Sequence, residues 1–259
     1  MKNNKTMILS MASALLISLS ACSNMETIDN TPNPNVVEEN LSGNLATLYT
    51  TTATGSATLK KTYSQVASTV NMAPTTIQVD PTKTYQSMDG FGFAITYSTC
   101  YNLMKMDAAS REKFLKQTYS TSEGYGVSYA RISIGCNDFS STEYSLCDTK
   151  GLENFALHKD ETSYVIPVLK EILAINPNLK IIASPWTSPK WMKVSDIKTK
   201  APFDSWTDGH LNPDYRKDYA QYFVKFVNIM KDNGINIYAV SPQNEPLNRA
   251  NCASLYMPW

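Results

Sequence analysis

Apolar stretches and helix-like stretches alternate four times between residues 90 and 246, and this alternation constrains the fold more than any other feature. The apolar stretches are residues 90–96, 129–134, 179–183 and 235–240, each with the length and the β-branched or aromatic content of a buried strand. Strands that alternate with helices pair in parallel and wind in a right-handed sense. The sequence therefore predicts an α/β fold.

Helix-boundary signals lie in the intervals between these strands. Asp107 is a predicted N-cap, and Ser163 is another, ahead of an apolar helix face. Asn212 followed by Pro213 predicts the start of a long helix, and Gly234 predicts its end. Each predicted helix falls between two predicted strands, as βα units require.

Polar or aromatic residues follow the carboxyl ends of the last three predicted strands. Asp138 follows the second strand, Trp186 the third, and Asn244 and Glu245 the fourth, where Pro246 favours an extended backbone at Glu245. In a parallel barrel these strand ends face one pocket. A doubly wound sheet would align them as well, but no Gly-x-Gly-x-x-Gly follows the first strand, which favours the barrel.

Composition excludes several classes of protein. The chain has 259 residues, no formal net charge and 42% hydrophobic residues, which is typical of a globular protein and not of a disordered or nucleic-acid-binding one. Its fifteen tyrosines and four tryptophans provide flat rings suited to sugars, although such rings also fill cores.

Cysteine and histidine usage does not predict a metal site. The cysteines beyond the leader are Cys100, Cys136, Cys147 and Cys252, with no Cys-x-x-Cys spacing, and there are two histidines. A structural zinc site is therefore not expected. Cys136 and Cys147 could pair in an oxidising compartment, and the sequence leaves this open.

The first 86 residues predict export and a small β-layer. Residues 1–22 read as a bacterial lipoprotein signal, with a positive start, an apolar run too short to span a membrane, and Leu19-Ser20-Ala21 before a lipidated Cys22. A plain secretory signal is the alternative. Residues 23–44 read as a flexible tether to the cell envelope, and residues 45–86 as strands of a side β-domain, with candidates at 46–52 and 75–79.

Four motifs between Met88 and Trp259 resemble glycoside hydrolase family 30, which includes lysosomal glucosylceramidases and β-1,6-glucanases. They are Asp89-Gly90-Phe91-Gly92, Asp138-Phe139-Ser140, Ala183-Ser184-Pro185-Trp186-Thr187-Ser188-Pro189 with Trp191, and Asn244-Glu245-Pro246, in that order. The resemblance implies an α/β (β/α)8 TIM barrel with a side β-domain. It also implies a retaining β-glycosidase that needs no cofactor and acts on a carbohydrate.

The resemblance also implies roles for particular residues. Glu245 matches the acid/base, which needs a raised pKa from burial or a nearby like charge. Asn244 matches the residue that binds the sugar 2-hydroxyl. The substrate-binding candidates are Asp138, Trp186, Asn244, Arg131 and Trp191. Arg131 would need a carboxylate if buried, and a structural ion pair remains its alternative; Trp191 could equally pack in the core.

The family nucleophile, a glutamate at the seventh strand, has no counterpart before Trp259, so residues 87–259 are expected to form the first half of a barrel of about 250 residues. We expect this chain alone to be inactive and to have unpaired sheet edges. Two hypotheses remain: a glycosidase acting on β-glucosidic linkages, and a lipid-anchored glycan-binding protein without activity. The particular glycoside, endo or exo action, and the oligomeric state are not indicated.

Overall fold

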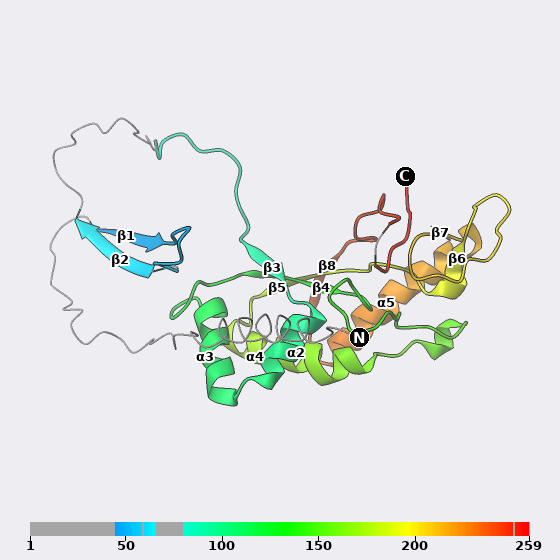
Figure 1. The fold of residues 1–259 in the computed structure, drawn as a ribbon, viewed down its shortest axis with the longest axis horizontal. Helices are drawn as coiled ribbons and strands as arrows, with labels where there is room; N and C mark the ends of the chain where they lie inside the picture. Colours follow the sequence, from blue (N-terminus) through cyan, green and yellow to red (C-terminus); the bar gives the residue numbers. More distant parts are fainter. Residues whose placement is uncertain (1–44, 59, 66–79, 251, 259) are drawn as a thin grey trace, which may run out of the picture. The chain divides into compact units, whose positions relative to one another are not determined.

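The computed structural model describes residues 45–58, 60–65, 80–250 and 252–258, and the chain divides into two units, 1–83 and 84–259 (Figure 1). In the first unit, β1 (Leu45–Thr50) pairs antiparallel with β2 (Lys60–Gln65). The strand and the turn at Gly55, where φ is +72°, agree with the sequence; β2 was not predicted. The candidate strand at 75–79, the tether and Cys22 lie outside the described residues.

The second unit contains a four-stranded parallel sheet in the order β3-β4-β5-β8. Its strands are β3 (Gly92–Ala94), β4 (Tyr129–Ser133), β5 (Lys180–Ser184) and β8 (Ile237–Val240). All four coincide with predicted strands, and the parallel pairing between neighbours is confirmed. Their carboxyl ends therefore share one edge of the sheet.

Gly92 on β3 permits the close approach of β4. A Cβ atom at this position would lie 1.9 Å from the carbonyl oxygen of Tyr129, so no larger residue fits without a backbone shift. A glycine within a strand often marks such a close approach of another backbone.

The main helices cover one side of this sheet (Figure 1). They are α2 (Tyr97–Lys105), α3 (Ala108–Tyr119), α4 (Ile166–Ile175) and α5 (Arg216–Asp232). Asp107 caps α3 by accepting from the Ser110 N–H at 2.9 Å, as predicted. In the described part of the chain, no helix combines the length and apolar character needed to cross a membrane.

Shorter elements complete the unit. They are η1 (Leu152–Asn154), η2 (Glu161–Val165), η3 (Lys190–Met192), η4 (Pro213–Tyr215), and the strands β6 (Lys193–Val194) and β7 (His210–Leu211), which pair antiparallel. Asn212 caps η4, which leads directly into α5, and Gly234 follows α5 with φ +81°. Both boundary predictions are confirmed.

One helix was not predicted, and one predicted N-cap was wrong. Helix α2 was not predicted, because residues 90–96 were read as one strand, whereas Thr96 accepts from the Thr99 N–H at 3.3 Å and starts a helix. Ser163 is not an N-cap, because it lies inside the π-helical turn of η2, which runs continuously into α4.

The two faces of the sheet differ in burial. Ala130 and Ile132 of β4 face the helices and are 2% exposed, whereas the alternate residues of β4 are only half-buried. At the edge strand β8, Tyr238 and Val240 are 57% and 43% exposed. Within the described residues, the sheet is thus packed on the helix side and open on the other.

Candidate functional site

Arg131 contacts residues that follow two neighbouring strands. This residue lies on β4, and its Nη2 donates a hydrogen bond to Oδ1 of Asn244, beyond β8, at 2.8 Å. Its guanidinium carbon lies 4.8 Å from the ring centroid of Trp186, beyond β5, in a cation–π contact. Three predicted site residues are therefore in contact, although no two of them are near each other in the sequence.

The contact with Arg131 determines which way the Asn244 amide points. Arginine carries only donors, so the amide oxygen of Asn244 must face Arg131. The Nδ2 group of Asn244 is then left to donate to another group. The partner of Arg131 is an amide; a carboxylate was expected only for a buried Arg131, and this residue is half-buried.

Gln243 ties the two neighbouring loops together. Its side chain is buried, and its Nε2 donates to the Trp186 carbonyl at 2.7 Å. The Asn244 N–H donates to the Pro185 carbonyl at 2.8 Å. Sequence reasoning missed Gln243, and its position directly before Asn244 was the available signal. Its buried amide holds the loop after β8 against the loop after β5.

Glu245 is exposed, so of the two settings expected for its carboxyl group, burial or a nearby like charge, burial is not present in the described residues. Its Oε2 accepts from Nδ2 of Asn248 at 2.7 Å. Its φ is +43°, in the left-handed region, so the extended backbone predicted from Pro246 was wrong. Such a conformation at a non-glycine residue costs about 1–3 kcal/mol and occurs often at functional sites. Hydrogen bonds on both sides of Glu245, from Asn244 and Asn248, hold it there.

Asp138 lies in an exposed turn after β4. The preceding residue, Asn137, is buried, and its Oδ1 accepts from the Phe139 N–H at 2.7 Å, which braces the turn. Burial, followed by the negative charges of Asp138 and Glu245, raises the pKa of the Cys252 thiol. Both carboxylates thus affect one thiol, which indicates that the turn at Asp138 and the loop at Glu245 lie near each other.

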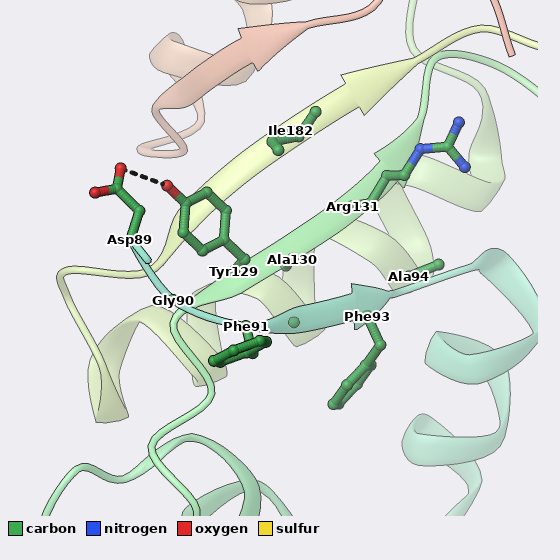
Figure 2. A pocket seen from close by; sticks show the side chains of 10 residues that line it. Asp89, Gly90, Phe91, Phe93, Ala94, Tyr129, Ala130, Arg131 and Ile182 are labelled. Carbon is green, nitrogen blue, oxygen red and sulfur yellow. Dashed lines mark hydrogen bonds between the residues drawn. The ribbon is translucent and has the colours of Figure 1, made fainter. Parts of the chain in front are cut away.

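A hollow of about 400 Å³ runs along β3 and β4 (Figure 2). Its lining includes Ala94, Tyr129, Arg131 and Ile182, and the Tyr129 hydroxyl donates to Asp89 at 3.1 Å. Arg131 belongs both to this hollow and to the contact with Trp186 and Asn244. The hollow therefore adjoins the candidate site.

Trp191 makes a different set of contacts. Its indole N–H donates to the Cys147 carbonyl at 2.8 Å, and its ring packs edge-on against Tyr215 at 5.1 Å. It also packs against the hydrophobic core. These contacts correspond to the core-packing alternative for Trp191.

The cysteines in the described residues are free thiols, so Cys136 and Cys147 are not paired. Among the residues that the structure describes, no group of three or more histidine, cysteine or acidic side chains is arranged to hold a metal ion. The chemistry available at this site comes from carboxyl, amide, guanidinium and indole groups.

The sequence and the fold of this chain are similar to those of known glycoside hydrolases. Residues 88–254 match the model of the glycosyl hydrolase family 30 TIM-barrel domain. The chain is 30% identical to the lysosomal acid glucosylceramidase of Mus musculus over 66% of its length and 33% identical to an endo-1,6-β-D-glucanase of Neurospora crassa over 70%. A solved endo-β1,6-glucanase is 57% identical, with a TM-score of 0.74 over 84% of this chain.

The parallel strands, with polar residues beyond their carboxyl ends, are the arrangement of a TIM-barrel domain. The chain belongs to glycosyl hydrolase family 30, and its four parallel strands form part of the barrel, as the sequence predicts. It spans 33% of the mouse relative, 38% of the Neurospora relative and 46% of the solved glucanase.

Proposed function

We propose that this protein is a retaining β-glycosidase that hydrolyses β-glucosidic linkages, with Glu245 as the acid/base. The observation that carries the proposal is the contact of Arg131 with both Asn244 and Trp186, directly beside Glu245. The reaction needs a second carboxyl group about 5 Å from the first as nucleophile. We do not assign the role of nucleophile to any of the 259 residues.

In the proposed reaction, Glu245 protonates the glycosidic oxygen as the bond to the sugar breaks, and a covalent glycosyl intermediate forms on the nucleophile. Glu245 then removes a proton from the water that hydrolyses the intermediate. The free Nδ2 of Asn244 donates to the sugar 2-hydroxyl, and Asp138 accepts from other sugar hydroxyls. Trp186, stacked on Arg131, provides a rigid flat surface for the ring.

We further propose a β-1,6-glucan as the substrate. The chain is 57% identical to the solved endo-β1,6-glucanase and 30% identical to the mouse glucosylceramidase. A polymer also suits an exposed strand-end site better than a lipid headgroup does, because successive sugar units extend along an open surface.

The second candidate is a glycan-binding protein without hydrolytic activity. The exposure of Glu245 favours it, because burial, one of the two settings expected for the acid/base, is not present there among the described residues. This candidate uses Trp186, Asn244 and Asp138 in binding alone.

The test joins this chain to the part of the 57%-identical glucanase that it does not cover, and assays β-1,6-glucan and a dinitrophenyl β-glucoside. Glu245→Ala should reduce glucan hydrolysis by about 10²- to 10⁴-fold, the range for loss of general acid–base catalysis. Azide should restore turnover of the dinitrophenyl substrate, because its leaving group needs no acid and azide needs no base. Glucan binding without hydrolysis in the unmutated fusion would favour the second candidate.

We also propose export and lipid anchoring in a bacterial cell envelope through Cys22. The support is the sequence of residues 1–22 alone, in which the apolar run ends at Leu19-Ser20-Ala21 immediately before the cysteine. An envelope location would bring the enzyme to extracellular polysaccharide.

A further inference from the structure

Lys193 is a charged residue with no access to water. It begins the short strand β6 and is 2% exposed, among the largest fully buried side chains of the described residues. A buried ammonium group is costly unless its hydrogen bonds are satisfied. The surroundings of Lys193 must therefore supply acceptors.

The ammonium nitrogen has four oxygen neighbours from three separate segments. They are the Thr187 hydroxyl at 3.1 Å and the carbonyl oxygens of Ser205 at 2.9 Å, Trp206 at 3.0 Å and Ser254 at 2.9 Å. All four are neutral, and an ammonium group has only three N–H donors, so the nitrogen is saturated. Lys193 thus joins the loop after β5 to the segment that follows Glu245.

The segment bound by Lys193 is docked along a second line of hydrogen bonds. Residues 252–256 run beside residues 206–209, and the contacts are Thr207 Oγ1 to Cys252 O at 2.6 Å, Asp208 N to Ser254 Oγ at 2.8 Å, Ser254 N to Trp206 O at 3.0 Å and Tyr256 N to Gly209 O at 2.9 Å. The Met257 N–H then donates to the Pro246 carbonyl at 2.8 Å. The docked segment therefore ends beside Glu245.

Nearby charges act on Lys193 in opposite directions. Burial lowers the pKa of its ammonium group to about 8, while Asp208, Cys136 and Glu143 raise it and Lys190 lowers it further. Arg249 pairs with Asp208 through two hydrogen bonds of 2.9 and 3.1 Å, which reduces the field of that carboxylate. Lys193 is therefore still mostly protonated at neutral pH, and its donors meet neutral oxygens.

We propose that Lys193 is a positioning residue whose ammonium group fastens residues 252–257 to the loop after β5 and so fixes the backbone of Glu245. The effect on hydrolysis rests on the proposed function, whereas the fastening of the segment does not. Without the ammonium group, three carbonyl oxygens and a hydroxyl lose a shared donor, and the segment should detach before the core opens.

Cys252 reports on the segment directly. It lies half-buried in the docked stretch, whereas Cys100, Cys136 and Cys147 are buried in the core. In the 259-residue chain, Lys193→Ala should increase the alkylation rate of Cys252 by tenfold or more, measured peptide by peptide with mass spectrometry. The three core cysteines should remain as slow as in the unmutated chain.

Chemical rescue separates the role of the ammonium donors from simple packing. Lys193→Ala removes the equivalent of a propylammonium ion, so added propylammonium should restore slow alkylation of Cys252. Tetramethylammonium has the same charge but no N–H donor, so it should not restore slow alkylation of Cys252. The matched control is Lys116→Ala, which removes a lysine of α3 that pairs with Glu112 at 2.8 Å and should leave the rate unchanged.

An unchanged Cys252 rate in Lys193→Ala would overturn the proposal, as would equal rescue by both cations. If Lys193→Ala makes all four of these cysteines reactive, the same alkylation measurement is made on Lys193→Met, which keeps most of the apolar part of the side chain. Should that variant also expose every cysteine, Lys193 supports the whole core and not the segment, and the proposal fails. In the glucanase fusion, Lys193→Met should lower kcat with little change in KM; an inactive unmutated fusion would count against the proposed function only.

Discussion

The Nη2 atom of Arg131 lies 2.8 Å from Oδ1 of Asn244, which joins two side chains 113 positions apart across the ends of β4 and β8. The bond fixes the amide orientation next to Glu245, and the same guanidinium lies over Trp186. One arginine thus organises the candidate site.

Replacing Arg131 with methionine should reduce kcat/KM of the glucanase fusion by about 10- to 100-fold. Hydrogen bonds to charged groups contribute about 1.5–3 kcal/mol, and each 1.4 kcal/mol is a factor of ten. The measurement is steady-state hydrolysis of a dinitrophenyl β-glucoside. Arg111→Met is the control, since Arg111 pairs with Glu171 at 2.8 Å on the helix layer and should leave kcat/KM unchanged. A change of less than twofold for Arg131→Met would contradict the assigned role.

Glu245→Gly should give a more stable chain than Glu245→Ala, by about 1 kcal/mol, because only glycine adopts φ +43° without strain. Both substitutions remove the hydrogen bond from Asn248, so their difference isolates the backbone. The measurement is the free energy of unfolding in urea. Equal stabilities would mean that the left-handed backbone at this position is not strained.

The free energy of unfolding should fall by about 2 kcal/mol between pH 5 and pH 8 because of Glu161. Burial raises the pKa of this carboxyl from 4.5 to about 7, against a hydrogen bond from Tyr144. The folded state therefore binds more protons than the unfolded state in this window, so its stability is fully present below pH 4.5 and is lost as pH rises through 7. Burial also raises the pKa of Asp160, which adds to the same slope.

The check is urea unfolding at a series of pH values. Glu161→Gln should flatten the pH dependence, because the amide mimics the protonated carboxyl, whereas Glu153→Gln on an exposed turn should not alter it. A slope that persists in Glu161→Gln would assign the titration to another group.

Cys22→Ser should move the protein from the membrane fraction to the soluble fraction of a bacterial host and abolish labelling with a palmitate analogue. The reason is that lipid attachment needs the thiol at this position. Ser23→Ala is the matched control and should remain membrane-bound. Membrane association that survives Cys22→Ser would favour a plain secretory signal and another means of attachment.

Local signals in the sequence predicted the four strands of the parallel sheet and several helix boundaries correctly. Asp107 and Asn212 cap helices, and Gly234 follows one in a left-handed conformation, because these features depend on a few neighbouring residues. The four strands were found because buried parallel strands are apolar along their whole length. Helix α2 was missed, since its N-cap, Thr96, was counted as the last residue of the predicted strand 90–96.

Contacts at the site depended on distant parts of the chain. The sequence placed Asp138, Trp186, Asn244 and Glu245 beyond strand ends, but it did not predict the amide partner of Arg131, and the extended backbone predicted for Glu245 was wrong. The observed partners come from other βα units, which no local pattern encodes.

The sequence alone thus determined the four strands of the parallel sheet, the helices α3, α4 and α5 and the residues that follow the strands, because hydrophobic period, caps and glycines act over a few residues. Only the tertiary structure decided that Arg131 binds an amide, that Glu245 has a left-handed backbone and that a buried Lys193 holds the segment beyond it. Each of these features depends on groups that folding brings together from separate segments. Their interactions therefore contribute to stability only when the sheet has formed.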